Sequence, residues 1–269
     1  MEIRSRTRER RKKMALLLAG EKSFEVEAIL FDKDGTLLEF SYTWGAWTRH
    51  MQEGFTAPLE AKGFPALPLA ELGREWGISF GEDGVASGYD RSGPLAAGTL
   101  AELLALLTAC GYRRGLSWSE ARVFAQEGLH RAEGLMQQKR PALALPGVPE
   151  LLAACRTAGL PAAVVTADET TSAVQHLSWL GLDGYFAEII GTDQVDRGKP
   201  YGDMVELACR RLGVDPARVA VVGDTNGDMR MARAAGAGAA IGLAEAAQAG
   251  ELPDADVVLP SCAQLRLRG

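Results

Sequence analysis

The second half of the chain alternates short apolar runs with stretches in which apolar residues recur at helical spacing. The short runs predict buried strands, and the longer stretches predict helices that end at a glycine. The predicted strands are 162–166, 187–191, 219–223, 238–241 and an edge strand at 256–259. The predicted helices are 148–158, 170–180, 201–212 and 228–235. This order is typical of a parallel sheet with helical crossovers on both faces.

An earlier apolar run at 25–31 predicts the first strand of the same sheet, because a lone buried strand needs partners. The region that follows has a helical pattern, with predicted helices at 44–52, 67–76, 95–109 and 119–138. Five glycines between 77 and 93 predict a turning loop, and no strand pair is evident there. The sequence therefore predicts a three-layer α/β core, residues 23–40 and 141–269, with a helical domain inserted at 41–140.

Composition and charge narrow the class of protein. The 269 residues are 47% hydrophobic and 24% charged, as in ordinary soluble globular proteins. The net charge is −6, but residues 1–13 carry a balance of +5, so the remaining chain carries about −11. An acidic body argues against a nucleic-acid-binding protein. No apolar stretch is long enough to predict a membrane-spanning helix.

Residues 1–22 are predicted to be a basic tail that is disordered or amphipathic. The apolar run at 14–20 is short for a signal peptide and is closed by Glu21 and Lys22. Attachment of this tail to a membrane surface or an acidic partner is the alternative. The four cysteines lie at least 45 residues apart with no C-x-x-C pair. That spacing fits neither a zinc site nor a disulfide framework, and it suits a reducing cytoplasm.

Charged and hydroxyl side chains follow the carboxyl ends of the predicted strands: Asp32, Asp34, Thr166, Lys199, Asp224 and Asp228. Because ligands of such sheets bind beyond the carboxyl ends of the strands, we expect these side chains to converge on one edge. The alternation of a strand predicts that Asp32 and Asp34 point together while Lys33 points away. Gly35 allows the chain to turn sharply and to approach a ligand with its backbone.

Four carboxylates on one edge repel each other unless a cation lies between them. Their oxygen donors suit Mg²⁺ better than Ca²⁺, for which no EF-hand-like spacing is present. Thr166 offers a hydroxyl donor and Lys199 a point positive charge, as a phosphoryl group requires. The structural alternatives are an acidic turn with a helix cap at Thr36 and a strand-to-helix loop capped by Asp228.

These motifs resemble those of the haloacid dehalogenase-like superfamily. Phe31-Asp-Lys-Asp-Gly-Thr-Leu-Leu38 is similar to its D-x-D-G-T motif, and Gly223-Asp-Thr-Asn-Gly-Asp228 to its G-D-x-x-x-D motif. Thr166 and Gly198-Lys199-Pro200 resemble the two motifs between them. All four occur in the family's order within residues 25–242. The layout is similar to the phosphoglycolate phosphatase-like branch.

The resemblance implies a three-layer, Rossmann-like core whose insert at 41–140 is a C1-type helical cap. It also implies a Mg²⁺-dependent phosphatase that hydrolyses a small phosphate monoester. Asp32 would be the nucleophile that forms an aspartyl-phosphate, and Asp34 the general acid and then the base. Thr166, Lys199 and the backbone of Ala167 would bind the phosphoryl oxygens. Ala167 departs from the Asn or Gly that is common at this position.

The resemblance further implies a metal site for Mg²⁺. Asp32, Asp224 and the backbone carbonyl of Asp34 would bind the ion. Asp228 would be a further ligand or an anchor for the others. The metal would be the cofactor of the reaction.

Two alternative functions remain open on the same fold. The presence of Asp34 favours a phosphatase or a phosphomutase over the family's dehalogenases and ATP-driven pumps, which lack this acid. A phosphomutase is therefore one alternative. A non-hydrolytic phospho-accepting or binding module is the other, although receiver domains are shorter and lack a cap.

The cap is expected to determine the substrate, with Tyr42, Arg49 and Arg91 as candidate specificity residues. An arginine among them would bind a substrate carboxylate or a second phosphate. The alternative is that these residues are solvated or have packing roles. We expect a small phosphorylated metabolite as the partner, neither nucleic acid nor stable membrane insertion, and a cytoplasmic location.

Overall fold

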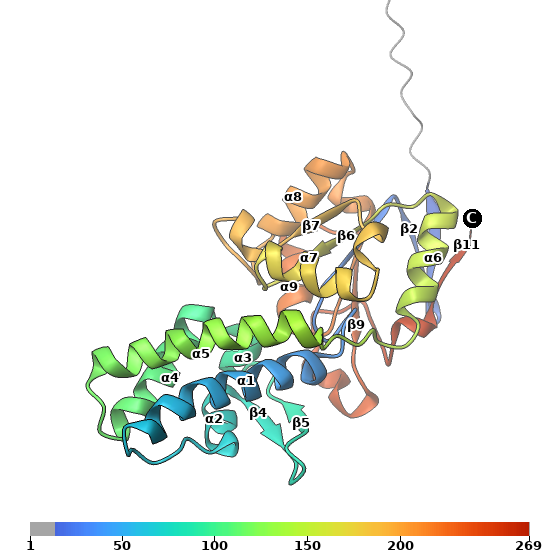
Figure 1. The fold of residues 1–269 in the computed structure, drawn as a ribbon. Helices are drawn as coiled ribbons and strands as arrows, with labels where there is room; N and C mark the ends of the chain where they lie inside the picture. The colour runs from blue at the N-terminus through green and yellow to red at the C-terminus, as the bar shows by residue number, and fades with distance from the viewer. Residues whose placement is uncertain (1–13, 269) are drawn as a thin grey trace, which may run out of the picture. The chain divides into compact units, whose positions relative to one another are not determined.

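The computed structural model describes residues 14–268, and the chain divides into two compact units (Figure 1). The first, an α/β unit, holds the residues up to Thr36, Pro146–Val174 and the residues from Leu182 onward. The second, a helical unit, holds Leu37–Leu145 and Gln175–Gly181. These bounds differ by a few residues from the insert placed at 41–140.

The α/β unit is built on a six-stranded parallel sheet in the order β10-β9-β8-β3-β6-β7. Its strands are β3 (Ala28–Phe31), β6 (Ala162–Val165), β7 (Glu188–Ile190), β8 (Val219–Gly223), β9 (Ala239–Leu243) and β10 (Val257–Leu259). Every residue of β3, β6 and β8 is buried, as parallel strands covered on both faces require. The predicted α/β class with a parallel sheet is confirmed.

Helices link these strands, as Figure 1 shows: α6 (Val148–Ala158), α7 (Thr170–Trp179), α8 (Asp203–Leu212) and α9 (Asn226–Ala234). Short 3₁₀ turns complete the connections at Asp183–Tyr185, Thr192–Gln194, Pro216–Arg218, Ala246–Glu251 and Cys262–Gln264. On one face of the sheet, α8 and α9 pack Met204, Val205 and Met229 against the alternating strand residues Leu30 and Val221. The predicted helices of this region are confirmed, with small shifts at their ends.

A second, antiparallel sheet in the same unit corrects the prediction for the N-terminal region. It consists of β11 (Leu265–Arg268), β1 (Ala15–Ala19) and β2 (Lys22–Val26), in that order. The prediction of a tail up to residue 22 is wrong for residues 14–22, because β1 pairs with a strand at the other end of the chain. No local pattern reveals that pairing. Residues 1–13 of the predicted tail lie outside the described residues.

The predicted first strand at 25–31 is also wrong in part. Val26 ends β2 and Ala28 begins β3, and these two strands belong to different sheets. Val26 adjoins the apolar residues of β3 with only Glu27 between them, so the sequence pattern merges the end of β2 with β3. Only β3 enters the parallel sheet, where it lies between β8 and β6.

The helical unit contains α1 (Phe40–Ala61), α2 (Leu69–Trp76), α3 (Pro94–Ala97), α4 (Leu100–Arg113) and α5 (Trp118–Lys139). The two longest, α1 and α5, run side by side in Figure 1. Gly54 of α1 meets Gly128 of α5, and a Cβ on Gly54 would lie 2.9 Å from the Cα of Gly128. The absence of side chains at both positions therefore allows the two backbones to approach closely. Aromatic and aliphatic side chains, including Phe55, Trp76 and Leu107, fill the core.

A β-hairpin in the helical unit corrects the prediction of a loop without strands. Strands β4 (Ile78–Phe80) and β5 (Ala86–Tyr89) pair in antiparallel fashion around the glycine-rich turn. Tyr89 stacks on Phe40 of α1 with ring centroids 3.9 Å apart. Such short strands depend on this packing against a helix rather than on local sequence preference, so the pattern alone did not predict them.

Two properties of the described chain bear on its surroundings. No helix within residues 14–268 is long and apolar enough to cross a membrane. The cysteines Cys110, Cys155, Cys209 and Cys262 are all buried and form no disulfide. Burial raises the pKa of the Cys155 thiol to about 11, so it stays protonated and unreactive near neutral pH.

Candidate active site

The adjacent strands β6, β3 and β8 bring predicted site residues to one edge of the α/β unit. The three strands are parallel and in register, and Thr166, Asp32 and Asp224 directly follow their carboxyl ends. The N–H of Asp32 continues the pairing of β3 with β8 by donating to the carbonyl of Val222 at 2.8 Å. The topology thus places these three residues, which are far apart in the sequence, at the same edge of the sheet.

Three carboxylates form a buried cluster at this edge. One oxygen each from Asp32, Asp224 and Asp228 lies within 4.8 Å of the other two, and none of these residues is more than 6% exposed. Lys199 reaches the cluster from the segment before α8. Its Nζ lies 2.5 Å from Oδ1 of Asp32 and 2.5 Å from Oδ1 of Asp228. The ammonium of Lys199, whose side chain is 13% exposed, therefore contacts two of the three carboxylates.

The three acids of the cluster lie close enough to repel one another when ionised. Burial, together with Asp228 and Asp224, raises the pKa of Asp32 well above its ordinary value, although Lys199 opposes this shift. Burial by itself lowers the pKa of Lys199, but Asp228 and Asp32 outweigh it and the net shift is upward. Lys199 therefore remains charged, and its single charge does not remove the repulsion among the acids.

The residues of this cluster fit a divalent cation. Their donors are carboxylate oxygens, which are the ligands that Mg²⁺ prefers. Gly35 has a φ of 82°, and a Cβ at this position would lie 2.3 Å from Oδ2 of Asp224. Only glycine therefore lets the backbone after Asp34 pass so close to the cluster. The side chain of Asp34 contacts Lys33 instead, so the prediction for Asp34 as a ligand concerns its carbonyl alone.

Asp228 combines a structural role with its place in the cluster. Its Oδ2 accepts hydrogen bonds from the N–H (3.0 Å) and the hydroxyl (2.6 Å) of Thr225, the N-cap of α9. Its Oδ1 faces Lys199. The capping alternative from the sequence is therefore correct for one oxygen of this carboxylate, while the other oxygen is available to the site.

The predicted phosphate-binding residues lie after β6 and before α8. Thr166 is buried, its N–H donates to the carbonyl of Ile190 (3.0 Å), and its hydroxyl accepts from the N–H of Asp168 (3.1 Å). Ala167 is exposed. The roles of Thr166, Ala167 and Lys199 toward a phosphoryl group stay predictions.

The expectation that Lys33 points away from its neighbouring acids is wrong, because its side chain contacts Asp34. Lys33 is fully buried, and its Nζ lies 2.5 Å from Oδ2 of Asp34 and 3.1 Å from Oδ2 of Asp168. The chain bends at Lys33 because β3 ends at Phe31, so strand alternation does not extend this far. Burial opposes the charge of Lys33, but Asp34 and Asp168 outweigh it and raise its pKa.

Sequence reasoning missed two residues that the structure adds to the site. Asp168 pairs with Lys33, and the signal for it was an acid two residues beyond Thr166, in the loop after the strand that neighbours β3. Thr36 is fully buried and its hydroxyl donates to Oδ1 of Asp224 at 3.4 Å. Its place in the motif gave no indication of that contact.

The candidate specificity residues Tyr42, Arg49 and Arg91 belong to the helical unit. Tyr42 lies in the first turn of α1 and is 53% exposed. Arg49 donates a hydrogen bond to the carbonyl of Gly84 at the tip of the hairpin. Arg91 follows β5 and is half-buried. Their role in substrate choice stays a prediction.

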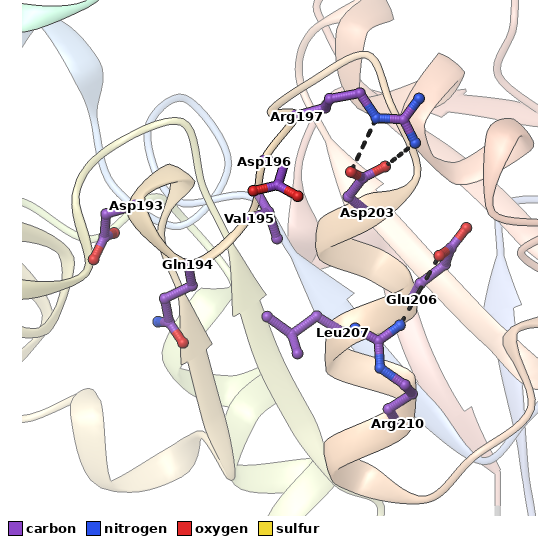
Figure 2. Close-up of a pocket in the computed structure, with 9 residues that line it drawn as sticks. All are labelled: Asp193, Gln194, Val195, Asp196, Arg197, Asp203, Glu206, Leu207 and Arg210. Atoms are coloured by element: carbon purple, nitrogen blue, oxygen red, sulfur yellow. Dashed lines mark hydrogen bonds and ion pairs between the residues drawn. The ribbon is translucent and has the colours of Figure 1, made fainter.

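An open hollow of about 390 Å³ lies beside α8, and its lining includes none of the acids of the carboxylate cluster (Figure 2). Its lining residues are Asp193, Gln194, Val195, Asp196, Arg197, Asp203, Glu206, Leu207 and Arg210. Arg197 forms two hydrogen bonds with Asp203 (3.1 and 2.8 Å), as Figure 2 shows, and both carboxylate oxygens are thereby engaged. Asp193 accepts hydrogen bonds from the N–H and hydroxyl of Thr170 (both 2.7 Å), at the start of α7. These charges serve local structure.

Known proteins similar to this chain include hydrolases and phosphatases. A sequence profile of the family described as haloacid dehalogenase-like hydrolase matches residues 26–236. The N-acetylmuramic acid 6-phosphate phosphatase of Pseudomonas aeruginosa is 31% identical over 217 residues, which cover 80% of each chain. The phosphoglycolate phosphatase of Escherichia coli is 36% identical over 91 residues, which cover 34% of this chain and 36% of that enzyme.

Solved structures show the same fold. The β-phosphoglucomutase of Clostridium difficile superimposes with a TM-score of 0.58 and 17% sequence identity. The superposition covers 90% of this chain and 93% of that one. At this level of identity the likeness concerns the fold alone.

Proposed function

Because the chain belongs to the haloacid dehalogenase-like hydrolase family, we propose that it is a phosphatase that forms an aspartyl-phosphate on Asp32. The phosphatase that aligns over 80% of both chains supports this activity. The observation that carries the proposal is the environment of Asp32. This buried carboxylate has Lys199 at 2.5 Å, two further acids within 4.8 Å, and the carboxylate of Asp34 two residues away.

In the first step, a carboxylate oxygen of Asp32 attacks the phosphorus and the ester P–O bond breaks. Asp34 gives its proton to the leaving alcohol oxygen. Thr166 and Lys199 bind the non-bridging phosphoryl oxygens, where negative charge is held through the transition state. The products of this half-reaction are the alcohol and a phosphorylated Asp32.

In the second step, water attacks the phosphorus of the aspartyl-phosphate. Asp34, now ionised, takes a proton from that water as the bond between Asp32 and phosphorus breaks. Inorganic phosphate leaves, and both carboxyl groups return to their starting states. One residue thus provides the nucleophile and the other transfers the proton in both directions.

Mg²⁺ is the proposed cofactor, held by Asp32, Asp224 and the carbonyl of Asp34, with Asp228 as a further ligand or anchor. When bound, such an ion offsets the charge of the phosphoryl group and of the three acids. The close approach of the three acids and their all-oxygen donors support this assignment.

The proposed substrate is a small phosphorylated metabolite that also carries a carboxylate. Both phosphatases described above are named for phosphate esters of small acids. An arginine of the helical unit, Arg49 or Arg91, would pair with that carboxylate. We expect Arg91→Ala to lower kcat/KM for carboxylated esters by about 10-fold, the loss of one charged hydrogen-bond partner, and to spare neutral esters. Equal losses on both kinds of ester would remove the idea.

The activity is tested by measuring phosphate release from a panel of phosphate monoesters, with Mg²⁺ and with EDTA. We expect release with Mg²⁺, little with EDTA, and a fall of at least about 1000-fold in Asp32→Asn. If the purified protein releases no phosphate from any ester, or Asp32→Asn equals the wild type, the proposal is wrong. Transfer of phosphate between positions of one substrate would indicate a phosphomutase. Stable phosphorylation without turnover would indicate a phospho-accepting module.

The proposed location is the cytoplasm. The four cysteines are buried, unpaired thiols, which is the usual state in a reducing compartment. Labelling with a thiol reagent only after unfolding would support this state. A disulfide in the protein purified from its own cells would contradict it.

A further inference from the structure

A second buried ion network joins the first two motifs. Nζ of Lys33 lies between Oδ2 of Asp34, at 2.5 Å, and Oδ2 of Asp168, at 3.1 Å. The side chain of Lys33 is 0% exposed, and those of Asp34 and Asp168 are 13% and 10% exposed. The proposed reaction uses Asp34, but it assigns nothing to Lys33 or Asp168.

Asp168 is itself fixed in place. Its Oδ1 accepts a hydrogen bond from the N–H of Glu169 at 2.8 Å, and its own N–H donates to the hydroxyl of Thr166 at 3.1 Å. Lys33 therefore links the loop after β3 to the loop after β6. Its partner in the second loop is Asp168, whose carboxylate is held by the N–H of Glu169. A buried lysine between two acids has little freedom to move its ammonium group.

Asp34 has one oxygen in this network and one outside it. Oδ2 contacts Lys33, whereas Oδ1 is buried and has no hydrogen-bond partner within residues 14–268. A buried polar atom without a partner costs free energy, so a fold that keeps one requires an explanation. The oxygen that carries a proton to a substrate needs to be unoccupied in this way.

We propose that Lys33, held by Asp168, is a positioning residue that anchors Oδ2 of Asp34 and leaves Oδ1 to transfer the proton. This inference rests on the proposed phosphatase. As the P–O bond to the alcohol breaks and the bond from Asp32 to phosphorus forms, the proton on Oδ1 of Asp34 passes to the leaving oxygen. In the second step Oδ1 receives a proton from the attacking water while the bond from Asp32 to phosphorus breaks. Lys33 acts only through Asp34.

The test compares two leaving groups. The leaving oxygen of an alkyl phosphate needs a proton, whereas p-nitrophenyl phosphate releases p-nitrophenolate, a stable anion that needs none. In Lys33→Met we expect kcat/KM to fall by about 100-fold for the alkyl ester, as for a misplaced catalytic group, and much less for the aryl ester. Asp34→Asn provides the benchmark, because loss of the acid should also lower kcat/KM for the alkyl ester more than for the aryl ester. A purely structural defect would lower both values together.

Two further variants protect the test against misfolding. Lys33→Met removes the ammonium that Asp34 and Asp168 share, so Lys33→Met/Asp168→Asn removes one of the two acidic charges along with it. Asp168→Asn alone keeps the shape of the side chain and loosens only the far end of the network. We expect the ratio of kcat/KM for the alkyl ester to that for the aryl ester to be the same in the double variant as in Lys33→Met. In Asp168→Asn this ratio should lie between those of the wild type and Lys33→Met. Thermal unfolding of each variant checks that it is folded, and Lys62→Met is the matched surface control.

Equal losses on both esters, or no loss in folded Lys33→Met, would overturn the inference while leaving the phosphatase intact. The failure of the proposed function looks different. In that case the wild type itself releases no phosphate from either ester, and the inference falls with it.

Discussion

Both units bury hydroxyl groups, such as Thr36 and Thr166 in the α/β unit, but they differ in the charged groups that they bury. Among residues 14–268, the buried carboxylates and ammonium groups are Asp32, Lys33, Asp224 and Asp228, and all belong to the α/β unit. The helical unit buries hydroxyls and imidazoles, namely Thr43, Thr48, His50, Thr56, Thr108 and His176. Among its ion pairs, Lys62 with Glu120 lies at the surface, with side chains that are 47% and 46% exposed.

This difference shows what each unit is organised to do. The buried hydroxyls of Thr48 and Thr108 donate to carbonyls one helical turn earlier, those of Trp44 and Leu104, so they need nothing from outside. The α/β unit instead holds three acids close together against one lysine, an arrangement that opposes stability. Packing gives no reason for such a cluster. Binding a cation and a phosphate ester does.

The largest expected effect distinguishes the lysine at the carboxylate cluster, which is 13% exposed, from a lysine of the helical unit that is 47% exposed. Lys199→Met leaves Asp32 and Asp228 without their cation. We expect phosphatase activity to fall by about 100-fold to 1000-fold and stability to fall by about 3–5 kcal/mol in EDTA. Lys62→Met breaks an exposed ion pair with Glu120 and a contact of the ammonium with the ring of Phe124, and should change stability by less than about 1 kcal/mol.

Thermal unfolding and initial rates measure both variants. Mg²⁺ should raise the melting temperature of Lys199→Met more than that of the wild type, because the ion replaces part of the missing charge. Similar behaviour of the two lysine variants would remove the distinction between the units.

A smaller effect on activity and stability is expected when either of two glycines with a left-handed backbone conformation is replaced by alanine. Gly35 of the α/β unit and Gly63 of the helical unit have φ values of 82° and 78°. A Cβ at Gly35 would meet Asp224 at 2.3 Å, whereas a Cβ at Gly63 would meet nothing within 4 Å. Both Ala variants should lose about 1 kcal/mol of stability from backbone strain.

Only Gly35→Ala should also lose Mg²⁺-dependent activity, because its methyl group displaces Asp224 from the cluster. Titration of Mg²⁺ against initial rate measures this loss in each variant. An unchanged Mg²⁺ requirement in Gly35→Ala would show that Asp224 is not held at the site as described.

The smallest expected effect concerns an exposed cap in the helical unit. The hydroxyl of Ser117, then Lys62 and the N–H of Ser117, lower the pKa of Glu120 to about 2 from an ordinary 4.5. A carboxyl whose pKa is lower in the folded state stabilises the fold above its unfolded pKa, and this contribution is lost as the pH falls from about 4.5 to about 2. Glu120→Gln lacks that contribution at every pH.

The melting temperatures of the wild type and Glu120→Gln should therefore converge as the pH falls through this range. Activity near neutral pH should be the same in both. A constant difference in melting temperature from pH 5 to pH 2 would contradict the assigned pKa.

Much of the α/β unit could be predicted because its information is local and regular. The glycine that ends each helix and the apolar run of each strand placed β6, β8 and α8 nearly correctly. The rule that ligands bind at the carboxyl ends of parallel strands then brought Asp32, Thr166 and Asp224 to one edge. Residues that directly follow strands are fixed by topology, so their neighbourhood follows from strand order.

Other features depended on contacts that a local pattern does not contain. The run at 14–20 was predicted as part of a tail, but β1 is stabilised by pairing with β11 at the far end of the chain. The hairpin of β4 and β5 is set by packing on α1. Lys33 was given the wrong direction because strand geometry was extended beyond Phe31, where the strand ends. The path of the loop, and not the residue types, decides that an acid or a lysine points inward.

The central claim is that Asp32 carries the phosphoryl group while Asp34 transfers the proton. Acid quench of the protein during turnover of a phosphate ester, followed by peptide mass spectrometry, tests it most directly. We predict one phosphoryl group on the peptide containing Asp32, removable by hydroxylamine as an acyl phosphate should be, and absent in Asp32→Asn. It should accumulate in Asp34→Asn with an aryl ester, because hydrolysis of the intermediate lacks its base. Phosphate release by the wild type with no phosphorylated peptide in Asp34→Asn, or with the phosphoryl group on another residue, would contradict the account.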